Sequence, residues 1–344
     1  MRRFIAALIA MLLLCAGASA DQTILMTFAG DVTLGSQEGI RDHEGSLDTF
    51  AAREGMDYFL REVQPLFAGD DLTVVNLEGV LADSTRGARR DKSIRFRGPT
   101  AMTEILRAGS VEAVNLANNH TLDYGKTGYA ATLAALEEAS IAAFGTRQVY
   151  IFEKGNVRIA FLGLNAADYL RNRDWFRQEI PRLKQEEGVS AVVFTFHAGY
   201  EYRPTHSPRQ TEYARAAIDA GADLVIMHHP HVVQGMSVYQ NRSIFYSLGN
   251  FCFGGNKRVR SAPALIVRAE MHFSDEGAYL GQTMHLIPAH ISGTQPVSNY
   301  QPRLVTGDDA AAVLALVQAD TAFPLAPFDE SAGCASQPYL PAQP

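Results

Sequence analysis

The fold of this chain is indicated most clearly by residues 222–231, Ala-Asp-Leu-Val-Ile-Met-His-His-Pro-His. The apolar run at 222–227 is typical of a buried parallel strand. Pro230 disfavours a continued central strand, so the histidines are expected in the loop past its carboxyl end, where open α/β sheets place ligand sites. In an extended segment His229 and His231 would point to the same side and suit a transition-metal ion. The alternative is a chance cluster of solvated or core histidines.

Four other predicted strands are also followed by polar residues of metal-ligand type. The strands are residues 24–29, 72–75, 113–117 and 191–196, and the polar residues that follow them are Asp31, Glu78, Asn119 with His120, and His197. Helical spacing of apolar residues occurs between the strands, at 56–67, 99–108, 128–139 and 211–220. This alternation predicts an α/β fold with a cluster of ligands at one edge.

The chemistry of this cluster favours a divalent transition metal. Its members are carboxylates, one amide and imidazoles, without thiolates, and this set suits Zn, Mn or Fe in a one-metal or two-metal hydrolytic site. In a two-metal site a carboxylate bridges both ions, an activated water attacks, and an imidazolium protonates the leaving oxygen.

The remaining segments predict one large domain with an extension. Hairpins are expected at 149–164 and 232–247, and two more antiparallel strands at 264–273 and 278–287. Residues 166–188 are expected to be helical in their second half. We assign residues 21–290 to the main domain and 291–344 to a partly irregular C-terminal extension, whose last part from Phe323 has little periodicity and resembles a loosely attached tail.

The charge of the chain restricts its partners. The formal net charge of −7 over 344 residues argues against general nucleic-acid binding. One loop, residues 86–97, reverses this sign: it holds Arg86, Arg89, Arg90, Lys92, Arg95 and Arg97 against Asp91 alone. The loop either binds an anionic substrate through bidentate arginine contacts or is a solvated surface loop.

The N-terminus predicts export. Arg2 and Arg3 precede an apolar run at 4–17 and an Ala18-Ser19-Ala20 cleavage site, so residues 1–20 are interpreted as a cleaved signal peptide rather than an uncleaved anchor. The mature chain is then periplasmic or extracellular, without an integral membrane span. It keeps Cys252 and Cys334, which either pair in an oxidising compartment or stay unpaired.

Six ordered motifs between residues 24 and 287 resemble those of the CapA family. They are Gly30-Asp31, Asn76-Leu77-Glu78-Gly79, Asn118-Asn119-His120 with Asp123-Tyr124-Gly125, His197 with Gly199, Glu201 and Tyr202, His229-Pro230-His231 with Gln234, and Tyr246-Ser247-Leu248-Gly249-Asn250-Phe251. This is the poly-gamma-glutamate capsule biosynthesis group, which resembles the calcineurin-like metallophosphoesterases. The resemblance implies a four-layer α/β/β/α sandwich of metallophosphoesterase type.

The resemblance also implies a role for each motif residue. Asp31 and His231 would bind a first metal ion, Glu78 would bridge, and Asn119, His197 and His229 would bind a second ion. His120 would be the general acid and Asp123 would orient it. The residues expected to face substrate are Arg95, Arg97, Glu201, Tyr202 and Asn250.

The chain departs from the metallophosphoesterase pattern at the first metal. Thr33 stands where a histidine is usual, and the bridging aspartate of the second motif is replaced by Asn76-x-Glu78. Ala198 replaces a tryptophan common in the family, which would open the pocket beside the metal.

Two functions follow. The first is an exported metal-dependent hydrolase that acts on an anionic phosphoester or polymer. The second is a non-catalytic accessory that binds the polymer or a capsule synthesis complex, and the weakened first metal position favours it. Retention of His120 favours the enzyme, because a binding protein needs no general acid. No G-x-S-x-G elbow, P-loop or G-x-G-x-x-G supports a serine hydrolase or a nucleotide-binding domain.

Overall fold

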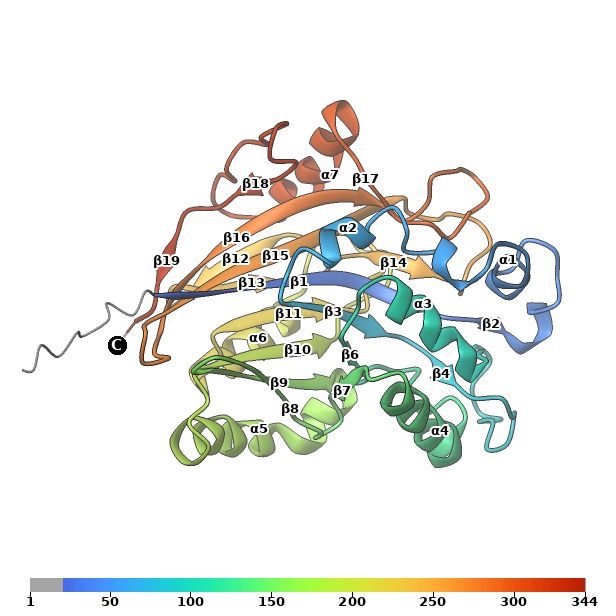
Figure 1. Ribbon diagram of the computed structural model, residues 1–344, viewed down its shortest axis with the longest axis horizontal. Coiled ribbons are helices and arrows are strands. Elements are labelled where there is room, and N and C mark those ends of the chain that lie inside the picture. Colours follow the sequence, from blue (N-terminus) through green and yellow to red (C-terminus); the bar gives the residue numbers. More distant parts are fainter. Residues whose placement is uncertain (1–20, 344) are drawn as a thin grey trace, which may run out of the picture.

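Two stacked sheets form the centre of the molecule, and helices cover their outer faces (Figure 1). The computed structural model describes residues 21–343, so the predicted signal peptide, residues 1–20, lies outside the described part. The helices are α1 (Leu47–Glu54), α2 (Gln64–Phe67), α3 (Thr103–Ala108), α4 (Gly125–Glu138), α5 (Ala166–Glu186), α6 (Pro208–Asp219) and α7 (Gly307–Ala319). The arrangement confirms the predicted α/β/β/α fold class.

The larger sheet mixes parallel and antiparallel strands. Its order is β17 (Arg303–Leu304), β16 (Tyr279–His290), β15 (Pro263–Phe273), β1 (Gln22–Thr33), β3 (Leu72–Leu77), β6 (Ala113–Asn115) and β7 (Ala142–Phe144). β14 (Asn250–Phe253) also pairs with β1, while β18 (Ala335–Ser336) and β19 (Leu340–Pro341) pair with β16.

The second sheet runs in the order β12 (Met236–Tyr239), β13 (Arg242–Phe245), β11 (Leu224–His228), β10 (Ala191–His197), β9 (Val157–Asn165) and β8 (Tyr150–Lys154). A small third sheet is formed by β2 (Ser36–Gln37), β5 (Phe96–Gly98) and β4 (Val80–Leu81). The predicted hairpins are present as the antiparallel pairs β8/β9, β12/β13 and β15/β16.

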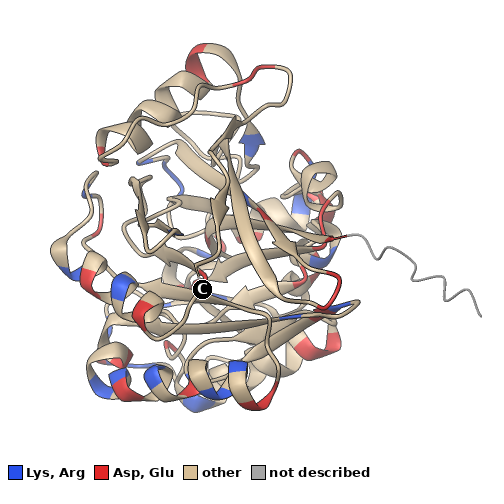
Figure 2. Ribbon diagram, turned by 90° about the vertical axis from the view of Figure 1, so that its left-hand side faces the viewer, with Lys and Arg blue, Asp and Glu red and all other residues tan. Residues whose placement is uncertain are grey.

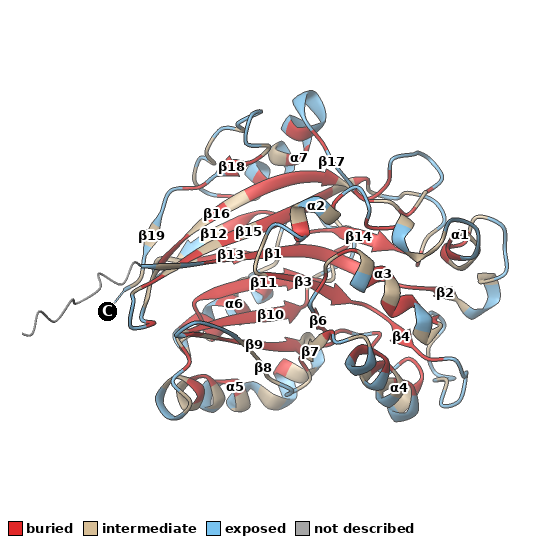
Figure 3. Ribbon diagram, viewed as in Figure 1, coloured by how far each residue is buried: buried red, intermediate tan, exposed pale blue. Residues whose placement is uncertain are grey.

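The strand that led the sequence interpretation is buried on both faces. β11 is parallel to β10 and β13, as predicted. Leu224 and Ile226 join the apolar cluster between the two sheets, whereas Val225 and Met227 face the cluster under α5 and α6. Because both faces are covered, a continuous apolar run is the pattern that this strand requires. Figure 3 shows the buried strands of both sheets and the exposed outer faces of the helices.

Charged side chains lie mainly on the outer helices and loops, and the sheets carry few of them (Figure 2). Within the described residues, no helix is both long and apolar enough to cross a bilayer.

Two predicted helices differ from the structure. Residues 56–67 form a 3-10 turn, Met56–Tyr58, and the four-residue α2, instead of one long helix. Pro65 stands in the first turn of α2, where its ring would clash with the preceding turn of a continuous helix. α5 begins at Ala166, earlier than expected, because the Asn165 side chain caps it by accepting a hydrogen bond from the Asp168 backbone N–H at 2.9 Å.

The C-terminal part is held firmly, so the expected loosely attached tail is wrong. Ala335 pairs with Leu286, and Leu340 pairs with Gln282, both on β16. These short strands use the hydrogen-bonding groups of β16 that would otherwise form an open edge.

Both cysteines of the main domain and extension are free and buried. The Sγ atom of Cys252 lies 3.5 Å from the carbonyl oxygen of Tyr300, and that of Cys334 lies 3.5 Å from the Ser336 hydroxyl. Burial raises the pKa of Cys252 to about 12. Residues 21–343 therefore contain two unpaired thiols, and burial disfavours the reactive thiolate of Cys252.

Asp320, just after α7, ties the extension to two loops of the main domain. Its Oδ2 atom accepts hydrogen bonds from the backbone N–H groups of His206 and Gly235, at 3.0 and 2.9 Å, and lies 2.9 Å from His206 Nδ1. These loops follow β10, which ends at the predicted ligand His197, and β11, after which the predicted ligands His229 and His231 come. The extension thereby braces the loops of the candidate site.

Replacing Asp320 with alanine should therefore destabilise the protein. We expect the Asp320→Ala change to lower the free energy of unfolding by about 2 kcal/mol, because it leaves partly buried donors without an acceptor. Urea unfolding measures the difference. Asp174, whose side chain is 79% exposed, provides the control: Asp174→Ala should change stability by less than about 0.5 kcal/mol. Equal effects of the two changes would contradict a bracing role for Asp320.

Candidate metal centre

The centre of the site is the carboxylate of Glu78, which follows β3. The residue is fully buried, and among residues 21–343 neither of its carboxylate oxygens has a hydrogen-bond partner. Three imidazoles surround it at ion-pair distance without a hydrogen bond: His197 Nε2 and His120 Nε2 lie 3.5 and 3.9 Å from Oε1, and His231 Nδ1 lies 3.9 Å from Oε2. A buried carboxylate without donors is costly, and a cation between it and the imidazoles would remove that cost.

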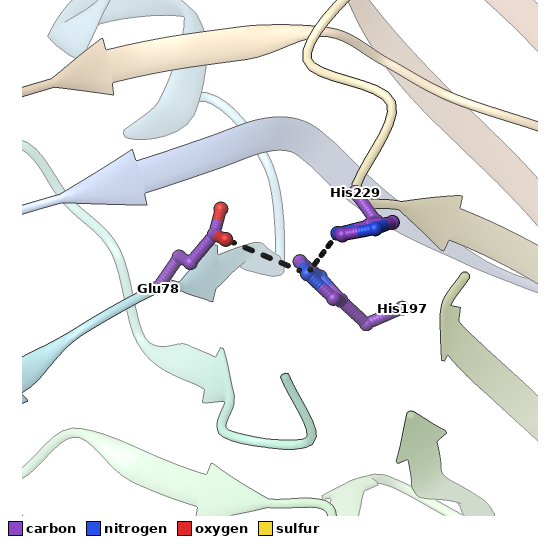
Figure 4. Close-up of side chains that lie close together, drawn as sticks. All are labelled: Glu78, His197 and His229. Atoms are coloured by element: carbon purple, nitrogen blue, oxygen red, sulfur yellow. Dashed lines mark hydrogen bonds and ion pairs between the residues drawn. The ribbon is translucent and has the colours of Figure 1, made fainter. Parts of the chain in front are cut away.

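Glu78 belongs to two groups of metal-ligating atoms. In one group its oxygen lies within 4.8 Å of ligand atoms of His197 and His229 (Figure 4). In the other it lies within the same distance of Asp31 and His231. Membership in both groups is the position that the resemblance gives to a bridging carboxylate. The donor set of oxygen and imidazole nitrogen fits Zn, Mn or Fe.

The predicted second-metal ligands meet as expected. His197 Nε2 lies 2.8 Å from Asn119 Oδ1 and 3.0 Å from His229 Nδ1. Asn119 and His229 lie in the loops past β6 and β11, and His197 is the last residue of β10. Two imidazole nitrogens facing each other at this distance need either a shared proton or a common cation.

The predicted first-metal ligands also lie together. His231 Nδ1 is 3.2 Å from Asp31 Oδ2 and 2.8 Å from Asn250 Oδ1. The other Asp31 oxygen accepts from Asn76 Nδ2 at 2.8 Å. The strand register brings these residues together, because Asp31 stands opposite Asn76 on one side of β1 and opposite Asn250 on the other.

The histidine loop does not have the extended backbone that the sequence suggested. His229 and His231 have φ values of 101° and 59°, in the region that non-glycine residues rarely adopt. The side chains nevertheless converge, with ring centroids 6.0 Å apart. Such strain persists only where the surroundings enforce it, and it clusters at functional sites. One enforcing contact is the hydrogen bond from the Tyr202 backbone N–H to the Pro230 carbonyl at 2.8 Å.

The charges of the site match what a metal ion requires. Burial raises the pKa of Asp31, whereas the hydrogen bond and the charge of His231 lower it. The net effect is a pKa below the ordinary value of an aspartate. The pKa of Glu78 is likewise lowered overall: burial opposes ionisation, and the charges of His231 and His197 favour it. Burial lowers the pKa of His229 to about 3. At neutral pH the carboxylates are therefore ionised and His229 is neutral, ready to donate a lone pair.

His231 behaves differently from its neighbour. Burial lowers its pKa, but the charges of Glu78 and Asp31 outweigh burial and raise the pKa to about 10. A protonated His231 thus places one positive charge beside the two carboxylates. A bound cation would take over this role and release the proton.

The predicted general acid and its partner lie beside this centre. His120 Nδ1 is 2.6 Å from Asp123 Oδ2, which leaves the other ring nitrogen on the side of Glu78. Asp123 is fully buried.

The predicted substrate residues do not share one environment. Glu201 is exposed and within 4.8 Å of ligand atoms of His229 and His231, at the rim of the centre. Tyr202 carries the guanidinium of Arg260 at 4.2 Å from its ring. Asn250 is buried against His231 and does not line an open surface.

Two arginines of the basic loop are engaged by the protein itself. Arg97 donates to both oxygens of Glu38, at 2.9 and 3.1 Å, and to the Ala82 carbonyl at 2.6 Å. Arg95 donates to the backbone carbonyls of Arg89 and Lys92. These contacts favour structural roles over the predicted contacts with substrate.

The sequence interpretation did not single out His228 or Thr33 as contact residues. His228 ends β11, and its Nδ1 lies 3.5 Å from Asp31 Oδ1 without a hydrogen-bond partner among the described residues. The position of His228 in the run His228–His231 was the sequence feature that could have identified it as a site residue. The Thr33 hydroxyl donates a hydrogen bond to the Glu78 carbonyl at 2.9 Å. Thr33, which stands where a metal-binding histidine is usual, therefore anchors the loop that carries Glu78.

We expect metal binding to increase the stability of the folded protein. Adding Mn²⁺ or Zn²⁺ to chelator-treated protein should raise its free energy of unfolding by about 2.7 kcal/mol at a free-metal concentration about 100-fold above Kd. His229→Ala should lose this gain. His285, a half-buried histidine on β16, supplies the control, since His285→Ala should keep it. An equal gain in His229→Ala and wild type would exclude the site described here.

Comparison with known proteins agrees with the six motifs. The family model described as "Bacterial capsule synthesis protein PGA_cap" matches residues 25–255. "Capsule biosynthesis protein CapA" of Bacillus anthracis is 30% identical over 300 residues, covering 80% of this chain and 69% of that protein. "PGA biosynthesis protein CapA" of Bacillus subtilis is 29% identical over 254 residues, covering 68% of this chain and 64% of that protein. A solved 5'-nucleotidase precursor from Thermus thermophilus is a distant structural likeness, 14% identical with a TM-score of 0.48, covering 87% of this chain and 59% of that chain.

The match to the family model and to the Bacillus anthracis protein shows that the chain belongs to the bacterial capsule synthesis protein family.

Proposed function

We propose that this protein is an exported, metal-dependent hydrolase that acts on an anionic substrate during synthesis of a capsule or envelope polymer. The substrate is a phosphoester or a γ-linked glutamate polymer. The observation that carries the proposal is the carboxylate of Glu78, buried without a hydrogen-bond donor among the described residues and between two groups of ligand atoms. The printed names of the two Bacillus relatives, which concern capsule and PGA biosynthesis, support the biological setting.

A metal ion would be held by the residues that surround this carboxylate. Glu78 would contribute to two positions, with Asp31 and His231 at one and with Asn119, His197 and His229 at the other. A divalent ion held there supplies a Lewis acid and lowers the pKa of water.

The residues around the ion would bind, orient and move protons. His120 would donate a proton from Nε2 to the leaving oxygen, because its Nδ1 is occupied by Asp123 at 2.6 Å and its Nε2 faces Glu78. The buried carboxylate of Asp123 would keep the imidazole in this orientation.

A positive charge at the rim supports an anionic substrate. Arg260 is exposed, and its guanidinium lies 4.2 Å from the ring centroid of Tyr202. The Tyr202 ring in turn lies 5.9 Å from that of His231. A guanidinium at this place would attract a carboxylate or phosphate toward the centre.

The alternative is a non-catalytic accessory that binds the polymer or a synthesis complex. Thr33 favours it, because this residue uses its hydroxyl on the Glu78 carbonyl and offers no imidazole to a first metal. The proposal of export, to the periplasm or outside the cell, rests on the predicted signal peptide at residues 1–20.

The two functions differ in the outcome of one substitution. We expect the purified, Mn- or Zn-loaded protein to hydrolyse a phosphodiester, a phosphomonoester or a poly-γ-glutamate chain. His120→Gln should lower kcat by about 100-fold or more while the metal content stays unchanged, because it removes only the proton donor. The measurements are chromogenic ester turnover, polymer length on a gel, and metal content.

His285→Gln is the matched control and should retain full activity. A loaded wild-type protein that binds the polymer but cleaves none of the three substrates would contradict the hydrolase and favour the accessory.

A further inference from the structure

Lys92 of the basic loop turns toward the predicted general acid instead of toward solvent. Lys92 forms an ion pair with Asp123 Oδ1, and its Nζ donates to the Asn119 carbonyl oxygen at 2.8 Å. Its side chain is 21% exposed. The sequence showed only a run of basic residues, in which Lys92 had no separate role.

The contacts of Lys92 argue against a direct role in binding substrate. Its ammonium group is already shared between the Asp123 carboxylate and a backbone carbonyl. It also lies 3.5 Å from His120 Nδ1, the ring nitrogen that is directed away from Glu78. Lys92 is thus on the far side of the imidazole from the candidate metal centre.

The buried carboxylate of Asp123 has a partner for each oxygen. Oδ1 pairs with Lys92, while Oδ2 accepts from the Phe96 backbone N–H at 2.8 Å and lies 2.6 Å from His120 Nδ1. A fully buried carboxylate needs this compensation, and Lys92 is the full positive charge that supplies it. Without Lys92, Oδ1 would be a buried acceptor with no partner among residues 21–343.

The same loop also holds the imidazole ring itself. The Phe96 ring lies 4.5 Å from the His120 ring, centroid to centroid, at an interplanar angle of 44°. Residues 86–97 therefore hold both members of the His120–Asp123 pair. Lys92 holds Asp123 through its charge, and Phe96 holds His120 through ring packing.

We propose that Lys92 is a positioning residue, which fixes Asp123 so that His120 presents Nε2 toward the Glu78 centre. The catalytic consequence rests on the proposed hydrolase function, whereas the structural consequence, a fixed Nδ1–H hydrogen bond to Asp123, does not. The basic loop thereby serves the proposed proton donor.

The catalytic test compares two leaving groups. Phenol is a poor leaving group that needs a proton from an acid catalyst, whereas 2,4-dinitrophenolate leaves without one. Comparing the phenyl and 2,4-dinitrophenyl phosphate esters therefore separates loss of acid catalysis from a general loss of active protein. We expect Lys92→Met to lower kcat for the phenyl ester by about 10-fold or more, with the dinitrophenyl ester falling less than about 3-fold. KM for both esters and the metal content should stay close to wild type.

The control is Lys126→Met, which removes an exposed cation from the first turn of α4 and should change neither ester. The ratio between the esters does not depend on the fraction of folded protein. An equal fall for both esters after Lys92→Met would overturn the positioning role.

A spectroscopic test covers the structural consequence. In protein labelled with ¹⁵N-histidine, the Nδ1–H proton of His120 should give a downfield resonance, assigned by its loss in His120→Gln. Lys92→Met should remove or broaden it, and Lys126→Met should not. A resonance that persists unchanged in Lys92→Met, or that is missing in the wild type, would refute the inference. If the wild type cleaves neither ester, the comparison of esters does not apply and this spectrum alone decides the role of Lys92; the proposed function itself fails only if the diester and the polymer are not cleaved either.

Discussion

A carboxylate with no hydrogen-bond donor among residues 21–343, buried where two sheets end, is the constraint around which this structure is arranged. Glu78 is fully buried, and both of its oxygens lack a partner within that range. Desolvation of an isolated carboxylate costs several kcal/mol, so the surroundings must supply positive charge. The His231 imidazole, whose pKa the charges of Glu78 and Asp31 raise, can supply one such charge. A divalent cation would supply it more directly.

The rest of the fold converges on this point. The parallel strands β1, β3, β10 and β11 deliver their carboxyl ends to one place, and the register of β1 sets Asp31 between Asn76 and Asn250. The left-handed backbone at His229 and His231 is the local cost of aiming both imidazoles inward. Asp320 of the C-terminal extension holds the loops past β10 and β11, so residues far from the centre contribute to its geometry.

Much of this arrangement could be predicted from the sequence, for identifiable physical reasons. The run at 222–227 had to be apolar because β11 is covered on both faces. Polar residues directly after a strand had to meet, because parallel strands end at one edge of a sheet. Asp31, Glu78, His197, His229 and His231 were predicted as ligands in this way, and the structure brings their ligand atoms within 4.8 Å in groups of three.

Other features depend on tertiary contacts that leave no local pattern. The two-residue strands β18 and β19 are too short to show alternation, and they exist because β16 offers an edge. Arg97 is engaged by Glu38, 59 residues away, so its charge alone suggested a substrate contact. Lys92 resembles its basic neighbours in the sequence, and only the fold turns it toward Asp123. Pro65 could have been recognised as the end of the predicted helix at 56–67, because proline is poorly tolerated inside helices.

The position of a bound metal tests the role of Glu78 most directly. Crystals of the protein soaked with Mn²⁺ or Zn²⁺ would be measured at a wavelength where the ion scatters anomalously. We predict an anomalous peak within coordination distance of the Glu78 carboxylate and of at least one of the imidazoles of His197, His229 and His231. A fully soaked crystal with no peak beside Glu78, or with peaks only at other surfaces, would contradict the claim that this carboxylate is buried to hold a metal.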